Sequence, residues 1–214
     1  MPTPIRSYTP KSPNGPFPYS AHDLKPVDNR DEVFYSVPRF VAHIDDTAIN
    51  ALRKYYEILP KHGRILDFCS SWISHYPRDY QALGTGMNEE ELRGNPILRE
   101  YKVQDLNENP QIPFQDLDAS TCTVSIDYLT RPVEVLTSLR RSSRPGASVH
   151  LAISNRCFPT KVVGRWLRIG EDERLDMVGD YLWWSGWRNI EIVTVVDGSR
   201  SDPLWVVRAR KQEE

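Results

Sequence analysis

Short apolar segments with the character of buried strands alternate along this chain with segments of helical periodicity. The strand-like segments are residues 64–69, 81–87, 101–106, 120–126 and 147–154, and the helical ones are residues 45–59, 88–93, 131–144, 160–167 and 172–184. Strands separated by helices need crossover connections, which are typical of a mostly parallel sheet with helices on both faces. Two alternating runs, 189–196 and 204–209, flank the turn-rich segment 197–203 and predict a closing antiparallel hairpin. The sequence therefore predicts an α/β fold with a seven-stranded, doubly wound, mostly parallel sheet.

The first thirty residues differ from the rest because they hold seven of the 17 prolines. Proline at this density opposes both helices and sheet ladders, so residues 1–30 are expected to form an extended arm. Two alternatives stay open for this arm: a disordered tail, or a strap that packs on the body through Phe17 and Tyr19. Residues 31–214 are expected to form a single domain.

Composition narrows the class of protein. The net charge is −2, from 27 basic and 29 acidic residues, which argues against a general nucleic-acid binder. No apolar run approaches the ~18 residues of a membrane span, so no membrane contact is expected. Cys69, Cys122 and Cys157 are widely spaced and form no CxxC pair, which argues against a disulfide framework or a zinc site. We therefore expect a cytoplasmic protein with structural cysteines and no bound metal.

Polar and small residues gather where the predicted strands end. The five segments concerned are residues 67–72, 84–88, 105–107, 125–128 and 154–157. Each alone would also suit a turn, since turns favour Asp, Asn, Ser and Gly. In an open parallel sheet, however, ligands bind in the crevice beyond the carboxyl ends of the strands. Five such segments at one edge of one sheet predict a binding site there.

Taken in order, these segments resemble motifs of the class I S-adenosylmethionine-dependent methyltransferases, in particular the type 11 methyltransferase domain. Residues 65–72 (Ile-Leu-Asp-Phe-Cys-Ser-Ser-Trp) stand in the place of the first motif, and residues 103–106 match the third strand with its terminal Asp. Residues 118–146 fit the fourth strand and the helix after it. Residues 154–161 resemble a subgroup of small methyltransferase-like proteins that share the Ser-Ser-Trp turn. The resemblance spans residues 34–209 and implies a Rossmann-like fold with S-adenosyl-L-methionine as cofactor.

The resemblance implies cofactor-binding roles residue by residue. Asp67 would brace the first turn and meet the methionine amino group, and Asp105 would accept a hydrogen bond from the adenine amine. The other positions would line the methionine end, lie along the ribose and adenine, or pass beneath the methionine: Cys69, Ser70, Ser71, Trp72, Met87, Asn88, Leu106, Ser125 and Ile126.

Two positions depart from the family pattern. Cys69, Ser70 and Ser71 stand where the family has a glycine-rich turn, in which the missing side chains let the backbone approach the cofactor. Gly86 aligns with the family's acidic residue that holds the ribose hydroxyls, and Asn88 could supply an amide there instead. If neither substitution works, a non-catalytic relative is expected.

The acceptor side is expected to combine the residues after the fourth and fifth strands with a helical lid region, residues 31–60, over a Rossmann-like core, residues 61–214. The candidate substrate-binding residues are Tyr35, Arg39 and Asp127, and the candidate catalytic residues are His43, Tyr128, Asn155 and Arg156. Arg156 would suit a carboxylate because a guanidinium pairs with it bidentately. Methyl transfer from a sulfonium needs mainly alignment, and His43 would serve as a base only for an acceptor that carries a proton.

We therefore expect an S-adenosylmethionine-dependent methyltransferase that acts on a small-molecule acceptor by in-line displacement. A chain of 214 residues with a short lid leaves little room for a domain that binds a macromolecular substrate. The alternative is a catalytically inactive methyltransferase-like binding module or partner subunit. A nicotinamide-dependent oxidoreductase is disfavoured because no GxGxxG follows the first strand. Trp183 or Trp184 could form a contact in a homodimer.

Overall fold

The computed structural model describes residues 4–28 and 34–213. Its centre is an eight-stranded sheet in the order β1-β7-β8-β6-β5-β2-β3-β4. The parallel strands are β2 (Ile65–Asp67), β3 (Ala82–Gly86), β4 (Leu98–Val103), β5 (Leu117–Thr123) and β6 (Ser143–Ser154). The hairpin strands β7 (Arg188–Val196) and β8 (Leu204–Arg210) join antiparallel, with β8 beside β6. The predicted α/β fold, mostly parallel with a C-terminal antiparallel hairpin, is confirmed, with one strand more than predicted.

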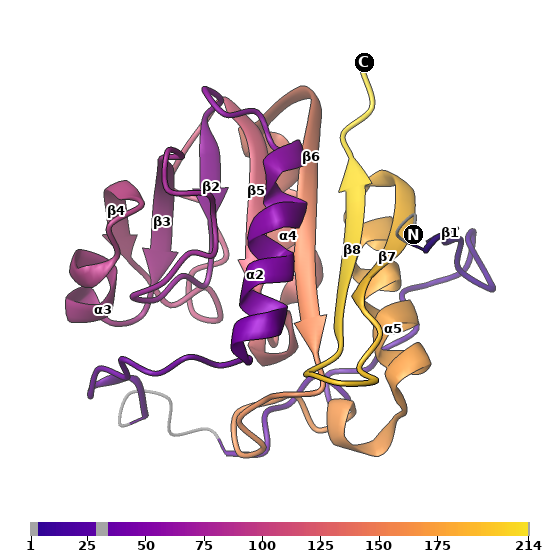
Figure 1. Ribbon diagram of the computed structural model, residues 1–214. Helices are drawn as coiled ribbons and strands as arrows, with labels where there is room; N and C mark the ends of the chain where they lie inside the picture. The colour runs from indigo at the N-terminus through magenta and orange to yellow at the C-terminus, as the bar shows by residue number, and fades with distance from the viewer. Residues whose placement is uncertain (1–3, 29–33, 214) are drawn as a thin grey trace.

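Helices cover both faces of this sheet (Figure 1). One face carries α2 (Asp46–Tyr55) and the 3₁₀ turn η1 (Tyr56–Ile58), and the other carries α4 (Pro132–Ser142) and α5 (Glu171–Trp184). At the β4 end of the sheet lies α3 (Glu89–Gly94), which connects β3 to β4. Two further 3₁₀ turns are η2 (Ile126–Tyr128), after β5, and η3 (Trp166–Arg168), before α5.

Successive strand residues pack on opposite faces, as the two-residue period of a strand requires. In β2, Ile65 packs in the cluster beneath α2, whereas Leu66 packs in the larger cluster beneath α4 and α5. Trp166 and Trp187 are among the largest fully buried side chains and belong to the larger cluster. The parallel strands end together at one edge of the sheet, the lower edge in Figure 1, and the turns that follow them lie along this edge.

The described part of the N-terminal arm, residues 4–28, is a strap on the body. Its strand β1 (Ile5–Ser7) pairs antiparallel with β7 and adds the eighth strand to the sheet. Tyr8 and Tyr19 each donate a hydroxyl hydrogen bond of 2.6 Å to the carboxylate of Asp180 on α5. Of the two alternatives for the arm, these contacts support the strap. The predicted boundary between arm and domain, at residues 30 and 31, lies outside the described residues.

The two tryptophans considered for a homodimer contact hold the strap. Trp183 Nε1 donates to the carbonyl of Pro13 at 3.0 Å, and Trp184 Nε1 donates to the carbonyl of Gly15 at 3.1 Å. The indole N–H groups of both tryptophans therefore form hydrogen bonds within the chain.

The predicted helix at residues 160–167 is wrong. This segment consists of turns with one isolated bridge, and only the turn η3 at its end is helical. Its backbone is tied to neighbouring segments: Val163 N–H donates to the Asp127 carbonyl at 3.0 Å and Gly164 N–H to the Lys25 carbonyl at 2.8 Å. The strand predicted at 101–106 lies earlier in the chain, as β4.

Candidate functional site

A cavity lies at the carboxyl edge of the parallel strands, between the strand ends and the lid segment, residues 34–45. It encloses about 1060 Å³ including its open mouth. Its wall is formed by the lid segment, by the turns after β2, β3, β4 and β5, and by one residue after β6: Phe34, Tyr35, Arg39, His43, Asp67, Cys69, Ser70, Ser71, Ile73, His75, Gly86, Met87, Asn88, Glu91, Gln104, Asp105, Leu106, Asn107, Thr123, Val124, Ser125, Tyr128, Leu129 and Phe158.

The turn after β2 is organised by Asp67, whose buried carboxylate accepts three hydroxyl hydrogen bonds. Ser70 Oγ and Ser74 Oγ each donate to Oδ2 at 2.6 Å, and Thr121 Oγ1 donates to Oδ1 at 3.0 Å. Burial raises the pKa of this carboxyl, and the three hydroxyl bonds oppose the rise. Asp67 therefore ties β2, β5 and the turn together at the floor of the cavity.

The backbone of this turn comes very close to β3. Cys69 has a φ of 53°, in the left-handed region that glycine adopts at least cost. Next to it, Ser70 N–H donates to the Thr85 carbonyl at 2.6 Å. The Ser70 carbonyl oxygen would lie 2.3 Å from a Cβ placed on Gly86. Position 86 is thus a glycine because two backbones meet there, and the family's acidic side chain would not fit without moving the turn.

Asn88 and Glu91 join α3 to the lid segment. Asn88 Oδ1 caps α3 by accepting from the N–H groups of Glu90 and Glu91 at 3.0 and 3.1 Å, and its Nδ2 donates to the Tyr35 carbonyl at 3.0 Å. Glu91 Oε1 accepts from Arg39 N–H at 2.7 Å, and burial raises the pKa of its carboxyl. The Asn88 amide, a candidate for the ribose position, is engaged in this cap and lid contact.

The loop after β4 brings Asp105 to the cavity wall. Asp105 Oδ1 accepts from Asn107 N–H at 2.8 Å. The Asn107 side chain then links this loop to the one after β5: Nδ2 donates to the Tyr128 carbonyl at 3.1 Å, and Oδ1 accepts from Thr130 N–H at 2.8 Å. Asp105 is therefore held in a fixed turn at the cavity.

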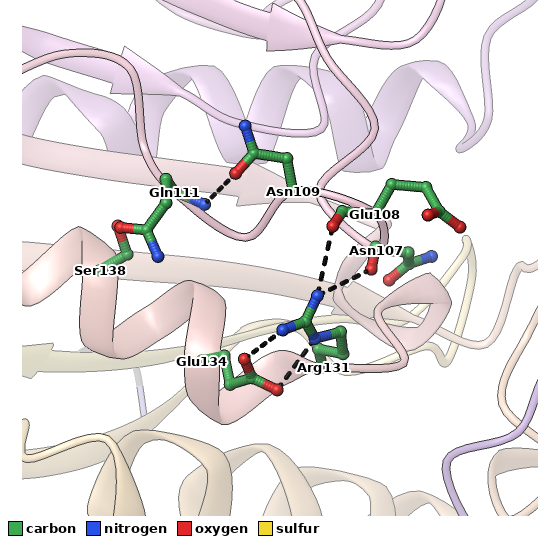
Figure 2. Close-up of polar contacts among 7 residues, drawn as sticks. All are labelled: Asn107, Glu108, Asn109, Gln111, Arg131, Glu134 and Ser138. Atoms are coloured by element: carbon green, nitrogen blue, oxygen red, sulfur yellow. Dashed lines mark hydrogen bonds and ion pairs between the residues drawn. The ribbon is translucent and has the colours of Figure 1, made fainter.

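Arg131 anchors the same loop to the start of α4 (Figure 2). Its guanidinium donates to the carbonyls of Asn107 and Glu108 at 3.4 and 3.2 Å, and it pairs with the carboxylate of Glu134. The guanidinium thus bridges the loop and the helix, and it lies outside the cavity.

Aromatic rings from three segments line one side of the cavity. The ring of Phe158, after β6, lies edge-on to Phe34 at 5.2 Å and to His43 at 5.5 Å, measured between centroids. Tyr128 is 6.2 Å from Phe158, and its hydroxyl accepts from Phe158 N–H at 2.9 Å. Burial, together with the charge of Arg39, lowers the pKa of His43, so its imidazole is neutral at pH 7.

His75 also lines the cavity, and the sequence reasoning missed it. Its side chain is buried, and Nδ1 has no hydrogen-bond partner in the described part of the chain. It lies in irregular backbone between β2 and β3, where no periodicity fixes the direction of a side chain. Its one sequence signal is its place shortly after the Ser-Ser-Trp turn. The other wall residues for which the sequence predicted no role are Phe34, Ile73, Glu91, Gln104, Asn107, Thr123, Val124, Leu129 and Phe158.

The structure brings most of the predicted site residues together. Those that line the cavity are Asp67, Cys69, Ser70, Ser71, Met87, Asn88, Asp105, Leu106 and Ser125 from the cofactor set, and Tyr35, Arg39, His43 and Tyr128 from the acceptor set. Their shared feature is a position directly after a parallel strand or in the lid segment.

Two predicted residues of η2 lie beneath the cavity instead of on its wall. Ile126 and Asp127 are both buried, with exposed fractions of 1 % and 3 %. Burial raises the pKa of Asp127 to about 7. As placed, Asp127 does not reach the substrate space assigned to it.

Three more predicted residues lie outside the cavity. Trp72 donates its indole N–H to the carbonyl of Val41 in the lid segment at 3.1 Å. Arg156 Nε donates to Asp202 Oδ1 at 2.8 Å, and its side chain is 63 % exposed. Asn155 is also exposed. The chain after β6 turns these two side chains toward the β7–β8 hairpin and solvent, and Phe158 is the residue that enters the wall.

The three cysteines, Cys69, Cys122 and Cys157, are free thiols. Across residues 4–28 and 34–213, no three His, Cys, Asp or Glu side chains gather as a metal ion would require. Nor does any helix in these residues have the length and apolar character needed to cross a bilayer.

No family model matches this chain, and no curated protein matches it. Solved structures do match. A SAM-dependent methyltransferase from Archaeoglobus fulgidus is similar with a TM-score of 0.56 and 13 % identity, over 78 % of this chain and 94 % of that one. The TehB-like SAM-dependent methyltransferase of Corynebacterium glutamicum is similar with a TM-score of 0.51 and 15 % identity, over 78 % and 90 %.

A third similar structure is phosphoethanolamine N-methyltransferase 2 of Haemonchus contortus in complex with S-adenosyl-L-methionine. Its TM-score is 0.53 and its identity 11 %, over 78 % of this chain and 53 % of that one. At such identities the likeness concerns the fold. This chain has the fold of the class I SAM-dependent methyltransferases.

Proposed function

We propose that this protein binds S-adenosyl-L-methionine in the cavity and transfers its methyl group to a small-molecule acceptor. One observation carries the proposal: the turns after β2, β3, β4 and β5 bring their polar and small residues to a single cavity. The cavity lies at the carboxyl edge of the sheet, where open α/β sheets bind ligands. The fold shared with SAM-dependent methyltransferases supports the same assignment.

The donor and acceptor groups of the wall suit the two ends of this cofactor. Ser70 and Ser71 offer small hydroxyl side chains to the methionine end. At the other end, Asp105 accepts a backbone bond at Oδ1 only, within the described residues, and Oδ2 can accept from the adenine amine. Met87 offers an apolar surface between these ends.

The ribose position is where this chain differs from the family pattern. Gly86 has no side chain to offer, and the Asn88 amide caps α3 and holds the lid segment. Glu91 is the carboxylate on this part of the wall, and one of its oxygens, Oε1, accepts from the lid backbone. We assign the ribose hydroxyls to Glu91.

When bound, the cofactor supplies a methyl group activated by the positive charge on sulfur. The chain's own residues position the acceptor and exclude water from it. The rings of Phe34, Tyr128 and Phe158 provide an apolar wall, and the lid segment covers the cavity from the side opposite the strand ends. His43, held neutral, offers a ring nitrogen that can accept a proton from the acceptor.

Calorimetric titration with S-adenosylhomocysteine tests the site. The intact protein should bind it with a micromolar Kd, and Asp105→Ala should weaken binding about tenfold because the adenine amine loses its acceptor. Glu108→Ala is the matched control, since Glu108 is exposed on the same loop and lies outside the cavity. Unchanged affinity in Asp105→Ala would remove the adenine assignment.

The second candidate is a binding module that holds the cofactor without turnover. It is favoured by the close contact of Ser70 and Gly86, which leaves no room for the family's ribose acid. Incubation with S-adenosyl-L-methionine and a panel of small hydroxyl, amine and thiol compounds distinguishes the two. Formation of S-adenosylhomocysteine with one of them supports the enzyme, whereas tight binding with no product from any supports the module.

A further inference from the structure

Arg39 is the one lysine or arginine on the cavity wall among the described residues, and the chain engages only part of its guanidinium. Nη1 donates to the carbonyls of Phe34 and Val37, the latter at 3.3 Å. Nε and Nη2 have no hydrogen bond within the described part of the chain, and the residue is only half-buried. Since a guanidinium is charged at pH 7, the wall carries a positive charge with two donor nitrogens open to a ligand.

The two open nitrogens lie on one edge of a fixed group. The N–H groups of Nε and Nη2 point to the same side, and this pair is an edge that a carboxylate can meet with both of its oxygens. The lid carbonyls hold Nη1, and the Phe34 ring covers one face of the guanidinium, with Cζ 3.8 Å from the ring centroid. These contacts orient the guanidinium, which lowers the entropy cost of pairing it with an anion.

The acidic side chains of the wall form no ion pair with this guanidinium in the part of the chain that the structure describes. Asp67 accepts three hydroxyl bonds in the turn after β2, and Asp105 accepts a backbone bond in the loop after β4. Glu91 accepts from the backbone N–H of Arg39 at 2.7 Å, and not from its guanidinium. The positive charge is thus left for an anion from outside the chain.

The guanidinium lies beside the aromatic part of the wall. The Phe34 ring that covers it also packs edge-on against Phe158, at 5.2 Å between centroids, and Phe158 packs against His43 and Tyr128. Burial and then the charge of Arg39 lower the pKa of His43, which places the guanidinium near this imidazole as well. The cavity therefore combines one open cation with an adjoining aromatic surface.

We propose that the methyl acceptor is a carboxylate with an aromatic or apolar body, which pairs with Nε and Nη2 of Arg39 and packs on Phe34 and Phe158. This inference rests on the proposed function, which gives the turns after the strands to the cofactor. A carboxylate in this pair has both oxygens engaged, so it serves for recognition and another atom of the acceptor takes the methyl group. An ammonium would face a like charge, and a neutral acceptor would cover the guanidinium without an anionic partner.

Benzoate and benzamide are the matched probes, because they share the ring and the planar end group and differ in charge. The protein is saturated with S-adenosylhomocysteine and then titrated with each probe at pH 7 by calorimetry. Benzoate should bind about tenfold more tightly than benzamide, and this preference should disappear in Arg39→Gln. The control Arg93→Gln removes the same charge from an exposed position outside the cavity and should keep the preference. Acetate, which lacks the ring, should bind more weakly than benzoate.

The ratio of the two affinities separates pairing from a merely structural role. Equal binding of benzoate and benzamide to the wild type would overturn the inference, and so would a preference that survives Arg39→Gln, even if both probes then bind more weakly. Arg39→Lys keeps the charge and loses the planar edge, so it should show a reduced preference. An undiminished preference in Arg39→Lys would contradict pairing at two nitrogens. Acetate binding as tight as that of benzoate would overturn the aromatic or apolar body.

S-adenosylhomocysteine has a carboxylate of its own, so its binding to Arg39→Gln is compared with that of methylthioadenosine, which shares the nucleoside and lacks the amino acid. Both compounds should keep their wild-type affinities in this variant. A loss of affinity for S-adenosylhomocysteine alone would place the cofactor's carboxylate at Arg39, which would overturn the inference and leave the proposed function standing. No binding of S-adenosylhomocysteine to the wild type would overturn the proposed function itself.

Discussion

Asp67, Asp105 and Asp127 each stand at the end of a predicted strand, yet the structure gives their carboxyl groups three different surroundings. Asp67 is buried and accepts three hydroxyl bonds. Asp105 lies in a turn at the cavity and accepts one backbone bond. Asp127 is buried beneath the cavity, where burial raises its pKa to about 7. The sequence places an aspartate near the end of each of these strands, but the role of each carboxyl group depends on the residues around it in the folded protein.

Replacing Asp127 with Asn should stabilise the protein more at pH 8 than at pH 5. The folded-state pKa of about 7 lies above the ordinary value of 3.8, so the folded protein holds this proton more tightly than the unfolded chain. The resulting stabilisation is complete below about pH 4 and is lost as the pH rises to 7. Above that pH the buried charge costs on the order of 2–4 kcal/mol. Urea unfolding of the wild type and of Asp127→Asn at pH 5 and pH 8 measures the difference in their unfolding free energies. An equal difference at both pH values would contradict a raised pKa for Asp127.

At the scale of helices and strands, the helices were predicted because each buries one face, and the central strands because they are short apolar segments buried on both faces. Periodicity failed where contacts between residues distant in sequence determine the backbone conformation. Residues 160–167 have helical spacing, but their backbone bonds to Asp127 and Lys25 instead. Residues 5–7 form a strand in the proline-rich arm because Pro4 and Pro10 lie outside the three paired positions.

The same limit applies to the candidate site. Strand topology alone brings the residues that directly follow β2, β3, β4 and β5 to one edge, so most of those predictions fall on the cavity wall. The direction of a side chain farther along a loop is set by its tertiary partners. Arg156 turns to Asp202, and His75 enters the wall from irregular backbone, and neither could be inferred from spacing.

Gly86→Ala should disrupt the contact between the turn after β2 and β3. The new Cβ would meet the Ser70 carbonyl oxygen at 2.3 Å, and a backbone atom cannot move aside as a flexible side chain can. We expect a loss of about 1–3 kcal/mol in unfolding free energy, together with weaker S-adenosylhomocysteine binding. Gly94→Ala, in α3, is the control, because its nearest neighbour is the Phe40 ring at an ordinary 3.4 Å. Wild-type stability in Gly86→Ala would show that the turn adapts.

The two tyrosines of the strap should contribute more to its attachment than its exposed ion pair does. Tyr8→Phe and Tyr19→Phe each remove a 2.6 Å hydrogen bond to Asp180 and should each lower the unfolding free energy by about 1–2 kcal/mol. Arg6→Ala breaks only an exposed ion pair with Asp176 and should cost less than about 1 kcal/mol. Urea denaturation of the three variants gives the ranking. A cost for Arg6→Ala as large as for either tyrosine would contradict it.

At the scale of the whole molecule, the cavity is closed by two parts of the chain that lie far apart in sequence. The strand ends supply one side, and the lid segment, fixed to α3 through Asn88 and Glu91, supplies the other. Hydrogen bonds within the chain hold both parts in place. We therefore predict that the site is formed before the cofactor binds.

A crystal structure of the protein with S-adenosylhomocysteine is the direct test of a cofactor site formed in advance. We predict the adenine amine at Asp105, the homocysteine end at Ser70 and Ser71, and the turn after β2 unchanged, with Asp67 still holding its three hydroxyl bonds. A cavity that stays empty at saturating ligand, or a ligand bound elsewhere on the chain, would contradict the assignment of the cavity as the cofactor site.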